Sequence, residues 1–193
     1  SPTPPPSTWT PVPSSTPIPE TIPTLFPAPP DTLPGTIIME SGNIPGDPEN
    51  HPIFLVKADG SGKRTLTGDA RGHAPALSPN GSQYAYIEFL SGTREEVLMI
   101  DNVQGTDARN ASTYWQGTVH LFEPDTPTWS PDGNWIVFSA MGMGAVLPDL
   151  YRARLIPTEG EEPSLERLTD DDVIESWPAF SPDGTRIVYV ADK

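Results

Sequence analysis

Hydrophobic positions between residues 35 and 193 gather in short runs separated by turn residues. The runs Tyr84–Ile87, Ile136–Phe138 and Ile187–Tyr189 are rich in β-branched and aromatic side chains and are apolar at successive positions. Strict alternation of apolar and polar residues is absent, which indicates strands that are buried on both faces. The pattern therefore predicts small β-sheets, each packed between two neighbouring sheets.

Each run follows a turn signal that reads Ser-Pro-Asp/Asn-Gly. Proline presets φ at the second turn position, Asp or Asn suits the third, and glycine takes the left-handed φ that closes a type I hairpin with a bulge. We expect positive φ at Gly133 and Gly184. The predicted turn residues are Ser78, Pro79, Asn80, Gly81, Ser130, Pro131, Asp132, Gly133, Ser181, Pro182, Asp183 and Gly184.

The turn signal recurs at a fixed period, because its serines at positions 78, 130 and 181 are 52 and 51 residues apart. Such a period is typical of solenoids and propellers, in which one supersecondary unit corresponds to one repeat. A short strand of the form Pro-x-(Leu/Trp/Phe)-Ser precedes each turn. Third strands are predicted at Val97–Asp101 and Leu150–Leu155, and a more polar fourth strand ends at Leu168-Thr169. Each unit therefore has four strands.

Partial units are expected at both ends of the repeat region. Upstream, "GTIIME" reads as a second strand and "HPIFLVKADGSGKRTLT" as third strand, turn and fourth strand. Downstream, only Ala191, Asp192 and Lys193 follow "RIVYV". We therefore expect two complete units flanked by partial ones.

The repeat resembles that of TolB-type β-propellers, in which Leu-Thr precedes Pro-x-Trp-Ser-Pro-Asp-Gly-x-x-Ile-x-Phe by about ten residues. Leu168-Thr169 leads to "WPAFSPDGTRIVYV" and Leu66-Thr67 leads to "APALSPNGSQYAYI". The middle unit has "RNASTYWQG" where Leu-Thr is expected, and the first turn has Leu77 and Asn80 in place of Trp and Asp. The resemblance implies an all-β fold of four-stranded antiparallel blades around a channel. Because propellers have about 4–8 blades, this would be a partial, open propeller.

Residues 1–34 differ sharply from the rest, because 13 of the 26 prolines lie there and the charged residues in that stretch are Glu20 and Asp31. Proline removes backbone donors and favours extended conformations. We expect a disordered Pro/Ser/Thr-rich linker or stalk over 1–34 and a partial propeller over 35–193. A stalk of this composition suits an extracellular or periplasmic protein that is tethered through sequence upstream of residue 1.

The formal net charge of −15, from 26 acidic and 11 basic residues, argues against nucleic acid and against anionic membranes as partners, since both favour basic surfaces. Solubility explains the excess, and a cationic partner or calcium is the alternative. The chain has no cysteine, and this absence does not indicate a particular cellular compartment. No apolar run reaches 18 residues, so we expect no direct membrane insertion in this segment.

Candidate chemistry is weak, and no catalytic, cofactor-binding or metal-binding residue is assigned. His51, His73 and His120 lack zinc-ligand spacing, and no G-x-S-x-G sequence is present. "DGSGKR" at 59–64 reads as a hairpin turn. Asp132 and Asp183 are expected to bond their own backbone rather than a metal. Asp170–Asp172 is expected to be a solvated loop rather than a calcium site. The two N-glycosylation sequons, which begin at Asn80 and Asn110, are attributed to chance.

These observations favour a non-catalytic binding or sensor propeller of an exported or cell-surface bacterial protein, which recognises a protein, peptide or glycan. An accessory propeller of a prolyl-oligopeptidase-type peptidase and a periplasmic TolB-like scaffold are the alternatives. The remaining blades would come from the rest of the parent chain or from a second copy.

Overall fold

The computed structural model describes residues 35–41, 51–67, 72–90, 95–111, 121–154 and 164–192. The predicted linker over 1–34 lies outside these ranges. Within them the regular structure is β-strand, as the sequence predicts: β1 (Thr36–Glu40), β2 (Ile53–Lys57), β3 (Arg64–Thr65), β4 (Gly72–Leu77), β5 (Gln83–Phe89), β6 (Glu96–Asn102), β7 (Arg109–Asn110), β8 (Leu121–Trp129), β9 (Trp135–Gly142), β10 (Asp149–Arg154), β11 (Ser164–Arg167), β12 (Ile174–Phe180) and β13 (Ile187–Asp192).

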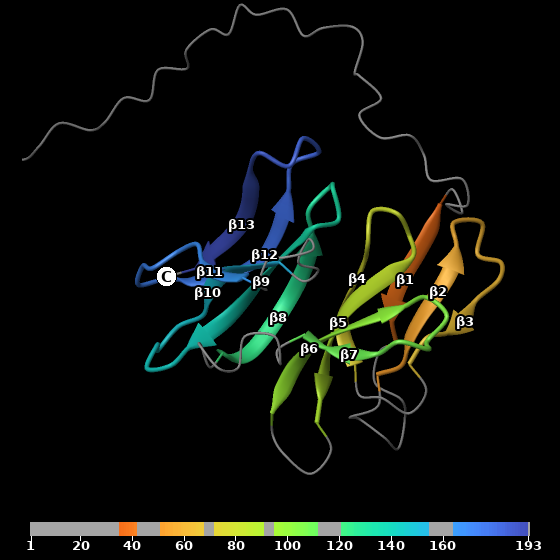
Figure 1. Ribbon diagram of the computed structural model, residues 1–193, viewed down its shortest axis with the longest axis horizontal. Helices are drawn as coiled ribbons and strands as arrows, with labels where there is room; N and C mark the ends of the chain where they lie inside the picture. The colour runs from red at the N-terminus through yellow and green to blue at the C-terminus, as the bar shows by residue number, and fades with distance from the viewer. Residues whose placement is uncertain are drawn as a thin grey trace, which may run out of the picture.

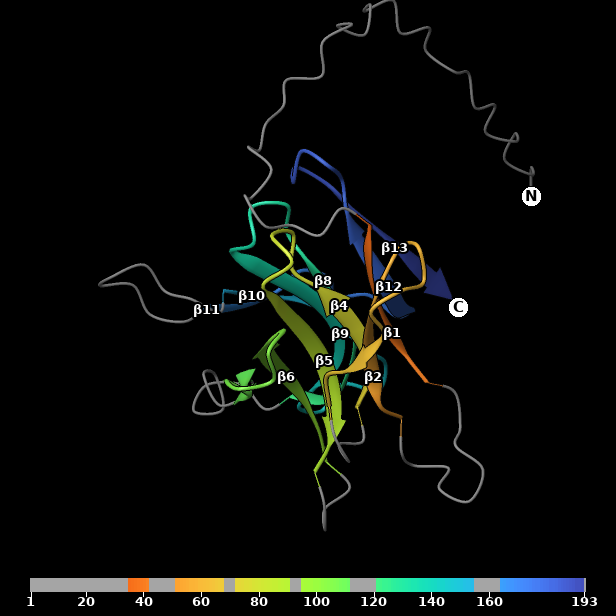
Figure 2. The ribbon, with the colours of Figure 1, turned by 90° about the vertical axis from the view of Figure 1, so that its right-hand side faces the viewer.

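The strands form separate antiparallel sheets that follow one another along the chain (Figure 1). Two sheets have four strands, in the orders β4-β5-β6-β7 and β8-β9-β10-β11. Before them lies β1-β2-β3, and after them lies the pair β12-β13. Seen from the side of the first sheet, the sheets stand behind one another (Figure 2). Among the described residues, the two four-stranded sheets therefore lie between a three-stranded sheet and a two-stranded one.

Antiparallel connection gives every blade two distinct ends. The turns at 78–82, 130–134 and 181–185 lie at one end, which we call the turn end. The connections that leave β5, β9 and β11 lie at the other, which we call the loop end. Successive turns are in contact, since a Cβ added to Gly133 would lie 3.9 Å from Pro79 Cδ and one added to Gly184 would lie 3.5 Å from Pro131 Cδ.

Side chains of consecutive sheets interlock to form the core. Ala85 and Ile87 of β5 pack toward the third sheet, in one cluster with Ile136 and Phe138. Their neighbours in sequence, including Tyr84 and Tyr86, pack toward the first sheet in a second cluster. Because successive side chains of a strand point to opposite faces, this arrangement explains why the strands are apolar at successive positions.

The turns share one hydrogen-bond pattern. Around Ser130, the Gly133 N–H donates to the serine carbonyl (2.9 Å), and the Trp135 N–H donates to the serine hydroxyl (2.9 Å). The hydroxyl donates to Asp132 Oδ1, which also accepts from the Asn134 N–H (3.0 Å). Equivalent bonds occur around Ser78 and Ser181. Gly133 and Gly184 have φ of 73° and 70°, as predicted.

The hydrogen bonds of this turn also change the pKa of its aspartate, as Asp183 shows. Hydrogen bonds from the Ser181 hydroxyl, and then from the backbone and hydroxyl of Thr185, lower its pKa to about 2. A carboxylate whose pKa is lowered in the folded state stabilises that state above its unfolded pKa. The contribution is therefore complete above about pH 4 and is lost as the pH falls toward 2.

The Leu-Thr pair of the repeat also has a structural role. The Thr67 hydroxyl accepts a hydrogen bond from the Ile53 N–H (2.9 Å), and the Thr169 hydroxyl accepts one from the Leu150 N–H (2.9 Å). Each threonine therefore supplies the acceptor for a backbone donor at the start of a third strand. In the middle unit, Ala111 follows the fourth strand and is fully buried, in the place that Leu66 takes in the first sheet.

Candidate binding site at the loop end

A pocket of about 910 Å³ opens at the loop end of the third sheet. One wall is the connection after β9, residues Gly142–Leu147, and the other is Asp170–Asp172 after β11. The floor is formed by Asp149 and Tyr151 of β10 with Leu165 and Arg167 of β11.

Gly142 permits the packing of this floor. A Cβ at Gly142 would lie 2.6 Å from the Tyr151 hydroxyl, well inside contact distance, so that any larger residue would force the hydroxyl to move. Burial is the main cause that raises the pKa of Tyr151, so its hydroxyl stays protonated and serves as a neutral polar group beneath the pocket.

The charges of the floor are arranged around Arg167. Its guanidinium lies 2.7 Å from Asp149 Oδ2 and 2.7 Å from Asp170 Oδ1. Burial raises the pKa of Asp149, and the charge of Arg167 opposes that rise. No described lysine or arginine forms an ion pair with Asp171 or Asp172, so the pocket carries a surplus of negative charge at its mouth.

The surplus extends across the whole loop end. Among the described Lys and Arg residues, Arg167 alone lies at this end, since the others lie along the strands or at the turn end. The described acidic residues at the loop end come from all four sheets: Glu40, Glu88, Glu95, Glu96, Glu123, Asp125, Asp149, Asp170, Asp171, Asp172, Glu175 and Asp192. The net charge of the chain is therefore distributed unevenly.

The aspartates considered for metal binding have other surroundings. Asp170–Asp172 is exposed and forms a pocket wall, a role that sequence reasoning missed because the facing loop comes from another part of the blade. Asp132 and Asp183 accept hydrogen bonds within their own turns. Nowhere in the described ranges do three or more His, Asp or Glu side chains gather in a way that could hold a metal ion.

The three histidines are not brought together. The His51 ring nitrogen Nδ1 lies 3.1 Å from the Ser41 carbonyl, while His73 belongs to β4 and His120 lies outside the described residues. Of the two sequons, Asn80 is the turn residue itself and Asn110 ends β7.

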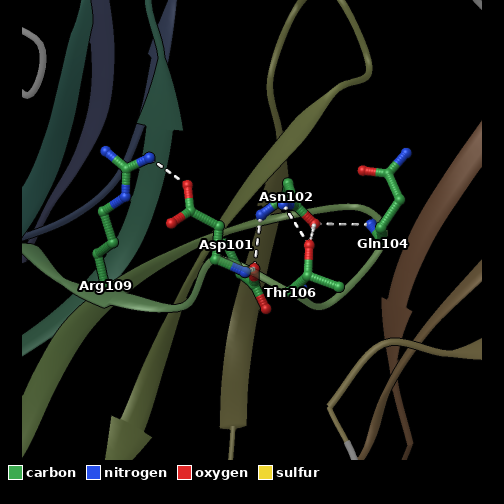
Figure 3. A network of polar contacts seen from close by, with 6 residues as sticks. Asp101, Asn102, Gln104, Thr106 and Arg109 are labelled. Carbon is green, nitrogen blue, oxygen red and sulfur yellow. Dashed lines mark hydrogen bonds and ion pairs between the residues drawn. The ribbon is translucent and has the colours of Figure 1, made fainter.

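A polar network in the β6-β7 hairpin is structural (Figure 3). Asp101 is buried and accepts hydrogen bonds from the N–H groups of Asn102 (2.7 Å) and Asp107 (2.9 Å). The Asn102 side chain accepts from the Gln104 N–H (3.0 Å) and donates to the Thr106 hydroxyl (2.9 Å). These groups satisfy one another, and the network closes the hairpin.

Within the described ranges, no helix is long and apolar enough to cross a membrane.

Known proteins share both the sequence repeat and the fold. The family model of the TolB β-propeller domain matches residues 40–193. An uncharacterized protein of Agrobacterium fabrum is 29% identical over 142 residues, which cover 72% of this chain and 42% of that protein. An uncharacterized peptidase of Bacillus subtilis is 25% identical over 169 residues, covering 72% of this chain and 24% of the peptidase.

Solved structures agree with this assignment. The structure of a TolB-type protein from Agrobacterium tumefaciens aligns with a TM-score of 0.61 at 21% identity, over 81% of this chain and 50% of that one. TolB from Acinetobacter baumannii aligns with a TM-score of 0.58 at 18% identity, over 78% and 33%. The chain spans half or less of the length of these relatives. By its matching residues and its blades, the chain belongs to the TolB β-propeller family.

Proposed function

We propose that this chain is a non-catalytic binding domain of an exported bacterial protein and that its loop end recognises a basic protein or peptide segment. The observation that carries the proposal is the pocket in the third blade, which joins a negative mouth to an apolar rim. Met143 and Val146 on that rim are 72% and 87% exposed, and Asp171 and Asp172 face them from the other wall.

This combination suits a lysine or arginine side chain. Such side chains lay an aliphatic stem along apolar surface and keep the charged head near polar groups. The acidic residues of the neighbouring sheets would add long-range attraction and raise the rate of encounter with a basic partner. We therefore favour a protein or peptide partner over an uncharged glycan.

A non-catalytic role agrees with how the repeated serines are used. The Ser130 and Ser181 hydroxyls donate to the turn aspartates and accept from backbone N–H groups. A nucleophile instead needs a base within hydrogen-bond reach, and neither described histidine contacts these serines. A broad peptidase and esterase panel would test the point, since turnover that is lost in Ser130→Ala or Ser181→Ala would contradict it.

We expect a Lys/Arg-rich peptide to bind this chain in a buffer of low ionic strength. The double substitution Asp171→Asn with Asp172→Asn should weaken that binding about 3–10-fold, since each exposed charge pair contributes about 0.2–1 kcal/mol. Isothermal titration calorimetry would measure it. The matched control removes the same charge at the turn end, by Asp59→Asn with Asp107→Asn. Equal weakening by both pairs would show a general charge effect and would contradict recognition at the pocket.

The proposed location and the role of residues 1–34 rest on composition. A proline-rich spacer tethered upstream would hold the blades away from a cell envelope and present the loop end to partners. The second candidate function is the accessory propeller of a peptidase, which the match to the Bacillus subtilis peptidase favours. Fold alone does not decide between these functions.

A further inference from the structure

The last described sheet, β12-β13, exposes apolar side chains at positions that are buried in another blade. Val188 and Val190 are 67% and 51% exposed. Counted from the turn serine, their counterparts in the second blade are Ala85 and Ile87, which are fully buried in the cluster shared with the third sheet. Val188 and Val190 therefore form an outer face, which we call the tail face, with the side chains of a blade boundary.

The register of the strands relates the first sheet to the third. In the first sheet, Glu40 of β1 pairs with Ile53 of β2. In the third sheet, Ser139 of β9 pairs with Leu150 of β10. Ile53 and Leu150 are counterparts, because each donates its N–H to the threonine of a Leu-Thr pair. Strand β1 is therefore the counterpart of β9, with Glu40 in the place of Ser139.

The first sheet has an exposed apolar face of its own. Counting back along the strands makes Ile37 the counterpart of Ile136, and Met39 is likewise the counterpart of Phe138. Ile37 and Met39 are 45% and 42% exposed, whereas both counterparts are buried. Because Ile38 between them packs toward the second sheet, Ile37 and Met39 point away from it. We call this outer face the head face.

Inside the chain, side chains at the tail-face positions pack against side chains at the head-face positions. At the boundary between the second and third blades, Ala85 and Ile87 share one cluster with Ile136 and Phe138. The two exposed faces lie on sheets at opposite ends of the row (Figure 1). Complementary faces at opposite ends of one molecule produce a head-to-tail contact between copies.

We propose that this chain associates head to tail with a second copy of itself, the tail face of one copy packing on the head face of the next. The contact removes the exposed valines of one chain and the exposed Ile37 and Met39 of the other from water, which favours association. This inference goes beyond the proposed function and does not rest on it, because the contact uses the outer faces of the end sheets and leaves the loop end open.

Analytical ultracentrifugation of the full chain tests the contact, at a moderate salt concentration that screens the repulsion between copies of net charge −15. The weight-average mass of the wild-type chain should reach about twice that of one chain or more as the concentration rises. A wild-type chain that stays monomeric would overturn the proposal and would leave the two faces to further blades of a longer chain or to another protein.

Two charged variants show which faces meet. Val188→Asp changes the tail face and Ile37→Lys changes the head face, and each variant alone should sediment as a single chain. An equimolar mixture should regain a mass about twice that of one chain, because the intact tail face of the Ile37→Lys chain meets the intact head face of the Val188→Asp chain. If like faces met instead, one of the variants would still associate alone and mixing would restore nothing, which would overturn the proposal.

Phe122→Asp is the matched control, because it adds the same charge at a residue of β8 that is 52% exposed in a central blade. This variant should associate as the wild-type chain does. Equal loss of association in Phe122→Asp and Val188→Asp would show a general effect of added charge and would overturn the proposal. Thermal melts followed by circular dichroism should match the wild type for all variants in their monomeric range, since every substituted side chain is exposed.

Discussion

Replacing Phe138 with alanine is expected to lower the free energy of unfolding by about 3–5 kcal/mol, whereas the same truncation at Tyr189 costs at most about 1 kcal/mol. Both residues occupy the third position of the apolar run after their turn. Phe138 is 1% exposed, and its ring lies 6.2 Å from that of Tyr151. Tyr189 is 43% exposed, because β12-β13 is a two-stranded sheet among the described residues.

Chemical denaturation followed by tryptophan fluorescence would measure both variants. The comparison is internally controlled, since the two rings occupy equivalent positions of the repeat, one in a sheet of four described strands and the other in a sheet of two. A large loss for Tyr189→Ala would mean that the last blade is covered in solution by something that the described residues do not include. A small loss for Phe138→Ala would contradict the packing between the second and third sheets.

Substituting valine for Gly133 is expected to cost about 1–3 kcal/mol, because a β-branched residue is strained at a φ of 73°. Space is not the obstacle, since the nearest atom to an added Cβ is Pro79 Cδ at 3.9 Å. Thermal unfolding would measure the loss.

Gly133→Asn is the matched control for this turn. Asparagine enters the left-handed region far more readily than valine, so the variant should keep most of the stability. If asparagine and valine cost the same, the loss would come from the added side chain and not from the backbone conformation.

The blades were predictable from the sequence because their signals are local. A turn signal such as that of Ser130–Gly133 contains its own hydrogen-bond partners, and the apolar runs after the turns show burial on two faces. The same reasoning predicts partial units at both ends. In the middle unit, where Leu-Thr is lacking, the small residue Ala111 is buried after the fourth strand, so the fold tolerates the departure.

Features that depend on neighbouring blades were not predictable. Ala74, Thr126 and Trp177 each precede a proline in an inner strand and have φ of 49°, 48° and 54°. The pattern alone predicts ordinary strands there, because a residue before proline favours extended conformations. Contacts from other elements help to hold two of them: Glu40 accepts from the Ala74 N–H (2.7 Å) and the Thr126 hydroxyl accepts from the Trp177 N–H (3.2 Å).

The pocket and the contact between His73 and Asp125 (3.8 Å) were not predicted from the sequence, for the same reason. Asp171 and Met143 are far apart in sequence, and only the return of β11 beside β10 brings their loops together. Asp125 is separated from His73 by an entire repeat, and no spacing rule within one blade relates them. A comparison of the repeats with one another shows which residues are equivalent, but it does not show which residues are in contact.

The stacking of inner strands has a consequence for synthesis on the ribosome. Strand β8 packs across the second sheet and β12 across the third, so that each new inner strand covers the sheet made just before it. A nascent chain can therefore bury a finished sheet as soon as the next hairpin emerges, without waiting for distant segments. Assembly would proceed from the N-terminus in steps of about fifty residues, in keeping with nearest-neighbour repeat proteins.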